Sequence, residues 1–489
     1  MKKTIAAAAL SSMLVLGLAS SALALHATET AETPTVVKGT SKITLDGSVR
    51  QRGYYDRDNW NESVDGAGAH SPGRSGYDTR VQLGVQAKVS DQATGYVKLE
   101  SGAGTSDVDA WGNPTVGGAG AADDNDYLFN GGSKQGGLNI LEAWVNYQPG
   151  VWGVKAGHMP LALGNKLFFD HTGSGDDALV FYANLGEATH VAGLTIKFDE
   201  NANGAFPGVA DASDDLDGYV GLITHKLSDS LNLGANWTYL RGGSESGTAA
   251  EPFSGLAMSN IGLTADGKVG AIDYLADLEF QFGDVADVDN VMNVDAGGWA
   301  MKVGANYDLG VGKIGLVFGY GSGDDAQDVI DDLADTDTDY NHDGFINFLT
   351  DTTYDTIIAG YRSPIPGAAS WAGAASTTGK NTGLSNLTLL QLKGSTKTVC
   401  PLTGKDLSLL ATASYMKLTE DTINYGTNKA DDVGTELDLI ATWALTAGLN
   451  YKVEAAYLFV GDVYESAANG AGSNPDDLMF LRHSLDLKF

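Results

Sequence analysis

One acidic segment near the middle of the chain carries oxygen ligands at the spacing of a calcium-binding loop. In DTDYNHDGFINFLTD, residues 337–351, Asp339, Asn341 and Asp343 stand at alternate positions and Gly344 follows directly. Carboxylate and amide oxygens at this spacing, before a glycine that makes a sharp turn, are typical of Ca²⁺ loops. The predicted ligands are Asp339, Asn341, Asp343, the carbonyl of Phe345, Asn347 and Asp351.

The same segment departs from a helix-loop-helix calcium site at its end. Thr350 stands where a bidentate acid is required, and the following TTYDTIIAGY is expected to be extended rather than helical. Residues 323–355 contain eleven aspartates and no Lys or Arg, so a bound divalent cation would offset their mutual repulsion. We therefore predict Ca²⁺ binding, with a solvated acidic loop as the alternative.

A second set of residues could select solutes by charge. Basic side chains recur on the polar side of several segments, and the predicted pore-lining set is Arg50, Arg52, Arg80, Lys98, Glu142, Lys155 and Arg482. Ladders of Arg and Lys favour anions, because a guanidinium group pairs well with carboxylate and phosphate. Two alternatives stay open. Pairs between Arg and carboxylate side chains only stiffen the wall formed by these segments, or the wall recognises one defined acidic solute.

The elements that position these residues are expected to be β-strands with two different faces. In RVQLGVQAKV, residues 80–89, apolar residues alternate with polar and charged ones at period two. The pattern recurs at 43–54, 141–147, 151–157, 231–239, 301–307 and 478–489. A soluble sandwich would alternate in the same way, so the alternation alone does not decide the fold.

The connectors decide it, because short and long ones take turns along the chain. Short ones are expected at 90–94, 148–150, 185–188, 228–230, 265–269, 309–312, 399–406 and 446–448, and the longest connector is 323–385. This alternation is typical of a transmembrane antiparallel β-barrel with short periplasmic turns and long extracellular loops. We predict about 18 strands, starting near residues 43, 77, 94, 137, 151, 177, 189, 217, 231, 256, 269, 297, 312, 386, 407, 435, 449 and 478. If one of the predicted hairpins is not formed, the number of strands is 16.

The two ends of the chain support this topology. Residues 1–24 read as a signal peptide with a basic start, an apolar middle and a small-residue end, and 25–42 as a short periplasmic segment. The predicted barrel then spans 43–489. Its last strand carries Leu481, Leu485, Leu487 and the terminal Phe489, with His483 as the one polar residue in the outward run.

These features resemble those of Gram-negative outer-membrane porins, and the strand count is similar to that of substrate-selective porins and alginate-exporter-like channels. The resemblance implies a multi-pass barrel in the outer membrane, in contact with its lipid, with a homotrimer or a monomer as the assembly. Aromatic girdles are expected at the strand ends, from Trp144, Tyr147, Trp152, Trp237, Tyr239, Trp299, Tyr307 and Tyr451.

The composition narrows the function further. A formal net charge of −32 argues against nucleic acid as a partner, because both would carry the same sign. The chain has one cysteine, Cys400, and no Ser–His constellation suited to hydrolysis, so we expect no enzyme.

The predicted function is a porin for passive diffusion of small hydrophilic solutes and ions, with a preference for anions. The alternatives are a selective channel for an acidic solute or an exported polysaccharide, and a calcium-binding surface barrel with an occluded lumen. Loop 323–385 is assigned to the extracellular side, where calcium would fix a lid or rim, and whether it folds inward over the pore stays open.

Overall fold

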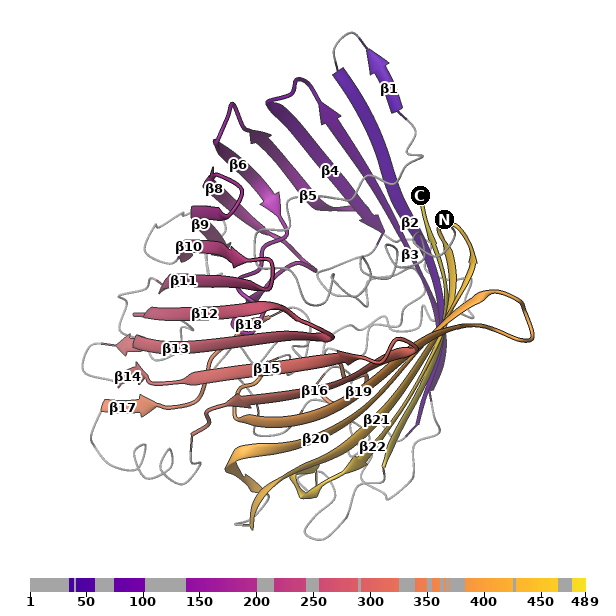
Figure 1. Ribbon diagram of the computed structural model, residues 1–489. Coiled ribbons are helices and arrows are strands. Elements are labelled where there is room, and N and C mark those ends of the chain that lie inside the picture. Colours follow the sequence, from indigo (N-terminus) through magenta and orange to yellow (C-terminus); the bar gives the residue numbers. More distant parts are fainter. Residues whose placement is uncertain are drawn as a thin grey trace, which may run out of the picture.

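The protein is a closed antiparallel β-barrel of 18 strands (Figure 1). The computed structural model describes residues 35–38, 41–57, 74–101, 138–199, 215–242, 255–288, 292–324, 339–349, 354–360, 365, 368, 383–424, 428–464 and 477–489. The predicted signal peptide, residues 1–24, lies outside them. Among the described residues, no helix is long and apolar enough to cross a membrane.

The barrel strands follow one another around the wall in sequence order. They are β2 (Ser41–Arg57), β3 (Arg74–Lys88), β4 (Ala93–Ser101), β5 (Leu138–Tyr147), β6 (Trp152–Met159), β8 (Asp176–Leu185), β9 (Thr189–Asp199), β10 (Leu216–Ser228), β11 (Leu231–Gly242), β12 (Ala257–Val269), β13 (Ile272–Val288), β15 (Trp299–Asp308), β16 (Gly312–Gly321), β19 (Leu387–Val399), β20 (Asp406–Asn424), β21 (Asn428–Thr446), β22 (Leu449–Val460) and β23 (Leu478–Lys488).

The first and last of these strands pair and close the barrel. Their register runs from Ser48 opposite Lys488 to Arg57 opposite Met479. The predicted strand number and order are therefore confirmed, including the strands expected near 177 and 386.

The predicted turn at 265–269 is wrong: β12 continues through Val269, and the turn falls at Gly270, whose φ of 61° suits glycine.

Among the described residues, five short strands and one turn of 3₁₀-helix accompany the barrel. β1 (Thr35–Lys38) pairs with the start of β2, while β14 (Met292–Ala296) pairs with β13 and, in parallel, with β17 (Asp339–His342). β7 (Phe169–Asp170) and β18 (Phe348–Leu349) form a separate two-stranded parallel sheet. The 3₁₀ turn η2 spans Asp462–Tyr464.

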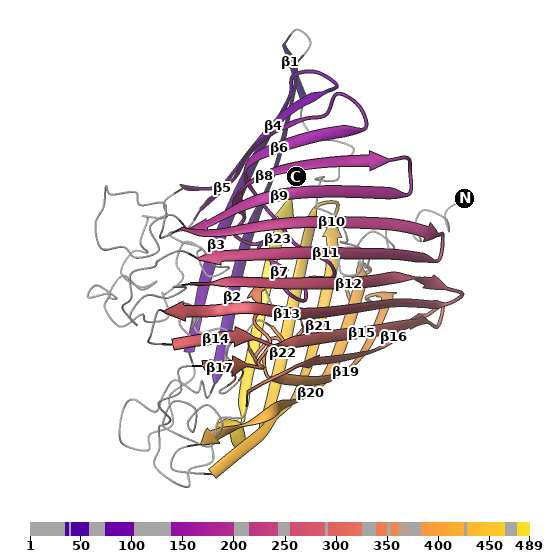
Figure 2. The same ribbon diagram turned by 90° about the vertical axis from the view of Figure 1, so that its left-hand side faces the viewer.

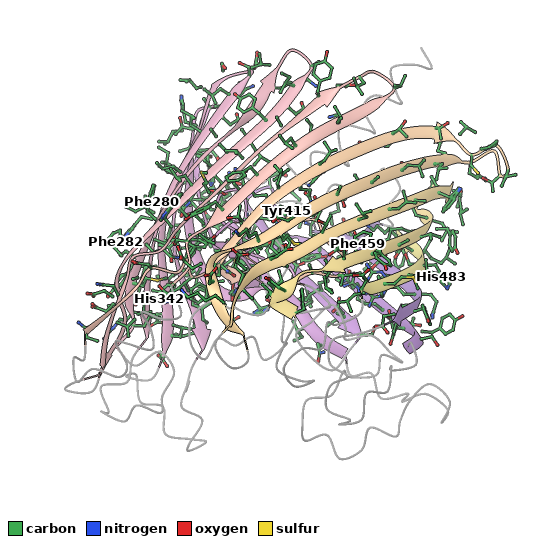
Figure 3. The ribbon with its side chains drawn as sticks, turned by 90° about the horizontal axis from the view of Figure 1, so that it is seen from below. Phe280, Phe282, His342, Tyr415, Phe459 and His483 are labelled. Carbon is green, nitrogen blue, oxygen red and sulfur yellow. The ribbon has the colours of Figure 1, made fainter. Side chains whose placement is uncertain are left out.

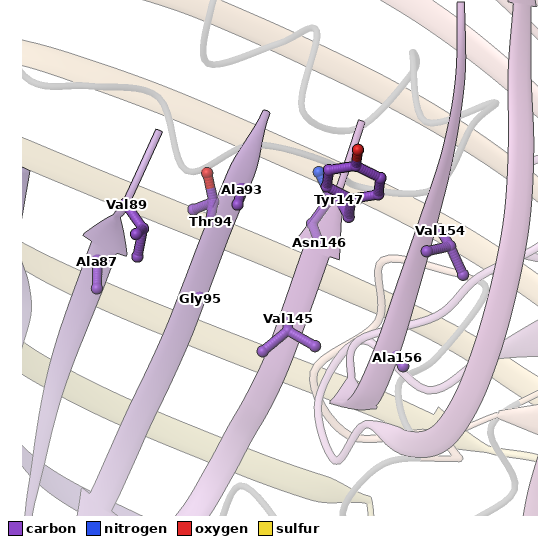
Figure 4. Close-up of a pocket in the computed structure, with 10 residues that line it drawn as sticks. All are labelled: Ala87, Val89, Ala93, Thr94, Gly95, Val145, Asn146, Tyr147, Val154 and Ala156. Atoms are coloured by element: carbon purple, nitrogen blue, oxygen red, sulfur yellow. The ribbon is translucent and has the colours of Figure 1, made fainter. Parts of the chain in front are cut away.

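The barrel wall has an apolar outer face. Its inner face is polar along some strands and apolar along others. Phe280, Phe282, Tyr415 and Phe459 are each more than 40% exposed and project outward (Figure 3). An apolar outer face with period-two alternation is the surface that a bilayer requires. Small outward side chains on β3–β6 leave a shallow groove there, lined by residues that include Ala87, Gly95, Val145 and Ala156 (Figure 4).

The inner face of β8, β9 and β10 is apolar as well. Val180, Leu194 and Val220 point inward and are at most 5% exposed, because polypeptide packs on them from inside the barrel. In β8 the burial alternates with period two although both faces are apolar. The hydrophobic core therefore sits inside the barrel, against one part of its wall.

Candidate pore wall and inner loops

The seven predicted pore-lining residues lie on neighbouring strands of one wall. Arg50 and Arg52 are on β2, Arg80 on β3, Lys98 on β4, Glu142 on β5, Lys155 on β6 and Arg482 on β23. Their neighbours in sequence, such as Val49, Val97 and Leu481, are exposed on the outer face. Because side chains alternate along a strand, all seven point into the barrel. We call this set the basic wall; its role in conduction remains a prediction.

Arginine is concentrated at this wall. Of the chain's eight arginines, six belong to β2, β3 and β23, at positions 50, 52, 57, 74, 80 and 482. Arg50 and Arg80 are directly opposite each other in the register of β2 and β3. A cross-strand pair of like charges is unfavourable for the sheet itself, so this pair concentrates positive charge at a cost in stability.

Carboxylates on the same or neighbouring strands hold several of these cations in place. The Nε of buried Arg52 donates to both carboxylate oxygens of Asp78, at 2.7 and 3.0 Å. The Nε of Arg482 lies 2.5 Å from Glu454, and the Nζ of Lys98 lies 3.6 Å from Glu142. Such pairs fix the direction of each cationic group, so that the wall presents an ordered array to the lumen.

An aromatic residue belongs to the wall, although the sequence placed it in a girdle. Trp144 points inward: its Nε1 donates to Glu142 at 3.1 Å, and the Nζ of Lys155 lies 3.9 Å from the ring centroid. The girdle prediction for Trp144 is therefore wrong, because residue 144 has the inward parity of β5. Tyr147 and Trp152 are 44% and 50% exposed on the outer face, where the girdle prediction placed them.

His483 points outward, as its position in the terminal run requires. Its ring lies 6.2 Å from that of Tyr77 and 6.0 Å from that of Tyr451, measured between centroids. The outer face thus accommodates this polar residue, labelled in Figure 3, between the rings of Tyr77 and Tyr451.

Two connectors fold into the barrel and meet there. The first inner loop, residues 160–175, joins β6 to β8, and the second inner loop comprises the described residues from 343 to 386. They pair through β7 and β18, with Phe348 opposite Phe169. Both strands lie within the barrel: β18 is labelled in Figure 1 and β7 in Figure 2. The sequence left open whether loop 323–385 folds into the barrel, and its described residues at β18 do so.

Aromatic packing joins the two inner loops. The ring of Phe168 lies 6.4 Å from that of Phe345 and 5.8 Å from that of Phe348, both edge to face. Phe198 of β9 stacks on Phe348 at 6.2 Å. Phe168 and Phe345 are completely buried. Edge-to-face aromatic contacts add to the hydrophobic stabilisation, so the two loops form one packed unit.

Side chains of the barrel wall hold the second inner loop. The carboxylate of Glu436 on β21 accepts backbone N–H groups of Ile357, Ile358 and Ala359 at 2.7, 2.7 and 2.8 Å. Gln281 on β13 donates to the Ile346 carbonyl at 2.6 Å and accepts the Ile346 N–H at 2.9 Å.

Most loop contacts lie away from the basic wall. In the described part of the chain, the inner loops are bonded to β13, β19 and β21 and pack on β8–β10. They meet the basic wall, which runs from β23 through β2 to β6, at β6, where the Ser174 carbonyl accepts a hydrogen bond from His158. A solute path would therefore run between the inner loops on one side and the basic wall on the other. Arg80, Lys98 and Arg482 have side chains 15–24% exposed, so they reach solvent on that side.

The segment predicted to bind calcium begins as a strand. Asp339 and Asn341 belong to β17, opposite Asn293 and Asp295 of β14, so the first half of the segment is extended. Alternate residues of a strand are about 6.6 Å apart along the chain, whereas Ca²⁺ ligands lie about 2.3–2.6 Å from the ion. The bend follows at Gly344.

The remaining predicted ligands have protein partners. The N–H groups of Asp343 and Gly344 donate to the Asp324 carboxylate at 2.5 and 3.0 Å. The Ser385 hydroxyl donates to the carbonyl of Phe345 and accepts the side-chain amide of Asn347. Asp351 lies outside the described residues. Within the described ranges no three His, Cys, Asp or Glu side chains gather as metal ligands, and Ca²⁺ binding by this segment remains a prediction.

The sequence reasoning missed the first inner loop and the anchor at Glu436. A signal for the loop was present, because MPLALGNKLFF, residues 159–169, is too apolar for a connector in water. Nothing in the sequence marked Glu436 as an anchor, because any inward polar residue of a strand would show the same pattern.

Comparisons with known proteins agree with this architecture. A family model described as "Alginate export" matches residues 231–474. None of the seven residues of the basic wall lies in that stretch. No curated protein matches the sequence of this chain.

Solved structures show the same barrel fold at low sequence identity. OccAB3 of Acinetobacter baumannii is 10% identical with a TM-score of 0.52, over 91% of this chain and 99% of that one. OccAB1 of the same organism is 12% identical with a TM-score of 0.52, over 91% and 96%. OccAB2 is 10% identical with a TM-score of 0.51, over 91% and 98%.

Proposed function

We propose that this chain, a Gram-negative outer-membrane β-barrel of the porin class, selects anions among the small hydrophilic solutes that diffuse through it. The observation that carries the proposal is the basic wall, whose oriented Arg and Lys side chains face two inner loops across the barrel. Charged rings and ladders that line a pore select ions by sign. The path needs no energy input and no catalytic step.

The chemical class of solute follows from the wall. Guanidinium groups bind carboxylate and phosphate in a planar, two-pronged geometry, which a point charge does not provide. Arg50 and Arg80, opposite each other on β2 and β3, could engage one anionic group together. Small carboxylates are therefore the preferred solutes under this proposal. The path lies within one barrel, so the proposal is the same for a monomer and a trimer.

The second candidate is export of an acidic polysaccharide, which the description of the matching family model favours. A polymer must thread the whole barrel, and the paired inner loops stand in its way. For this reason we favour small solutes. Inhibition of a small-ion current by alginate oligomers, with a residence time that grows with their length, would favour the polymer instead.

The experiment that tests the proposal is ion selectivity in a planar bilayer. In a tenfold KCl gradient, we expect a reversal potential with the sign of a chloride preference. Replacement of Arg50, Arg52 and Arg80 together by Ser should move it to zero or reverse it. Arg241→Ser is the matched control, because Arg241 is exposed near the end of β11, away from the basic wall. Unchanged selectivity in the triple variant, or an equal change in the control, would refute the proposal.

A further inference from the structure

Two pairs of buried carboxyl groups stand where the barrel wall holds the inner loops. Asp277 and Glu279 are on β13, and Glu436 and Asp438 are on β21. The members of a pair are two residues apart, so they share the inner face of their strand. All four side chains are at most 4% exposed. Each pair is therefore covered by polypeptide instead of facing the open lumen.

Each pair holds a different inner loop through backbone N–H groups. Oδ2 of Asp277 accepts the N–H of Asn165, in the first inner loop, at 2.8 Å. The two oxygens of Glu436 accept the N–H groups of residues 357–359, in the second inner loop, at 2.7–2.8 Å. Hydrogen bonds to an ionised acceptor are stronger than those to a neutral one. We therefore take Asp277 and Glu436 as the ionised members of their pairs.

The other member of each pair has an oxygen without a donor. Oε1 of Glu279 and Oδ1 of Asp438 have no hydrogen-bond partner among the described residues. Glu279 nevertheless lies within hydrogen-bonding reach of Asp277, and Asp438 within reach of Glu436. Buried polar atoms are normally paired, and two carboxyl groups this close do not both ionise. A proton on the second member supplies the missing bond, because a protonated carboxyl group donates one O–H.

The charges around the pair on β13 are consistent with one proton. Lys302 on the neighbouring β15 is opposite Asp277 in the register, so one cation offsets one carboxylate. Lys166 of the first inner loop lies 3.0 Å from Asp170 of the same loop, with which it forms an ion pair. Glu279 is therefore the neutral member of its pair.

The pair on β21 has no cation directed at it among its described neighbours. The titratable groups that the loop side brings to it are Asp355 and Tyr354 of the second inner loop and, behind them, Tyr464 of η2. Lys393 on β19 forms an ion pair with Asp355. Glu454 on the adjacent β22 is held by Arg482 at 2.5 Å and Lys452 at 3.0 Å. A second negative charge at Asp438 would stay unbalanced, so this side chain keeps its proton.

We propose that one proton shared within each pair latches the inner loop that the pair holds, so that the loops release from the wall as the pH rises. When the proton leaves, two like charges remain at a buried site, and water can hydrate both only if the loop moves away. Release of a loop widens the path beside the basic wall. The latch controls opening, so it does not depend on the proposed anion selectivity, which a reversal potential measures.

The sign of the pH dependence follows from where the proton is held. With the loop in place the pair keeps its proton, whereas with the loop released both carboxyl groups are hydrated and ionise at neutral pH. Release of a loop therefore frees one proton. The equilibrium constant for release should rise by up to about tenfold per pH unit, until the latched pair also loses its proton.

The test is native-state hydrogen exchange of both loops in detergent micelles, at about pH 6 and about pH 9, expressed as protection relative to the unstructured peptide. In the wild type, we expect the protection of residues 160–170 and of residues 354–360 to be lower at the higher pH. Asp438→Asn keeps a donor to Glu436 in the same shape but cannot ionise, and Glu279→Gln does the same beside Asp277. Both variants should fold, because neither leaves a buried charge without a partner.

Each variant is the control for the other. Asp438→Asn should abolish the pH response of residues 354–360 and keep that of residues 160–170, and Glu279→Gln should do the reverse. The single-channel current of the wild type should become larger and noisier at the higher pH, and that of the double variant should not. Equal protection of both wild-type loops at the two pH values would overturn the proposal. So would a wild-type pH response of residues 354–360 in Asp438→Asn.

Discussion

The anchor at Glu436 gives a prediction whose size follows from three hydrogen bonds. In Glu436→Gln, one carboxylate oxygen becomes an NH₂ group, which cannot accept the N–H of Ala359 and instead faces it donor to donor. The two bonds from Ile357 and Ile358 persist as neutral bonds. Hydrogen bonds to a charged group contribute about 1.5–3 kcal/mol and neutral ones about 0.5–1.5 kcal/mol.

The loss of one bond and the weakening of two amount to about 3 kcal/mol of local stability. Every 1.4 kcal/mol is about tenfold, so the equilibrium for opening the second inner loop should shift by roughly 100-fold. Local opening of this kind is measured by native-state hydrogen exchange. We expect the protection of the amides of residues 357–359 to fall by that factor while the barrel strands keep theirs.

The assay is hydrogen exchange of the peptide that contains residues 354–360, in detergent micelles, with single-channel current as a second measurement. Opening of the loop widens the path, so the variant should show a larger and noisier current. Glu454→Gln is the control: Glu454 is equally buried on the wall, but its partners are Arg482 and Lys452 instead of a loop. If protection at 357–359 stays within threefold of the wild type, the anchor reasoning is refuted.

Two further predictions concern Cys400, in the short turn between β19 and β20, and the acidic segment at 339–343. The pKa of Cys400, in the turn after β19, is lowered to about 7 because Thr403 hydrogen-bonds the thiolate. Alkylation by iodoacetamide should therefore rise with pH to half its maximum near pH 7, since the thiolate is the nucleophile. Thr403→Val should move that midpoint upward, and a wild-type midpoint near 8.5 would contradict the prediction. Calcium binding by the segment at 339–343 predicts that a chelator speeds its proteolysis while residues 345–346 stay protected by protein hydrogen bonds. Asp339→Asn with Asp343→Asn should be cleaved equally fast with and without calcium, and chelator-independent cleavage of the wild type would count against a site there.

The strand order of this barrel was predictable because a wall between lipid and polar lumen imposes period two on the sequence. The predicted starts near 43, 189, 231, 312, 449 and 478 agree with the observed strands to within two residues. The parity that placed Val49 and Val97 outside also placed Arg50 and Lys98 inside. The seven residues of the basic wall could therefore be assigned to the inner face from local pattern alone.

The same pattern weakened where the inner face is apolar. Val180 and Leu389 are buried inside the barrel, and their neighbours Phe181 and Leu390 are exposed outside, so the middle of β8 and the start of β19 lack the polar half of the alternation. The turn misplaced at 265–269 had a different cause. Its Asp-Gly pair favours a tight turn, yet pairing of Gly267 with Tyr274 extends the hairpin to Gly270.

The local sequence pattern predicts the barrel, its strand order and the inward side of the seven basic-wall residues. Contacts between distant segments bring residues 160–175 and the described part of 343–386 into the lumen, where they meet at Phe169 and Phe348. The contact between Glu436 and Ile357 joins residues 79 positions apart. Period-two alternation reports which face a side chain occupies, whereas the choice of what packs on the inner face depends on contacts between distant segments, which leave no local periodicity.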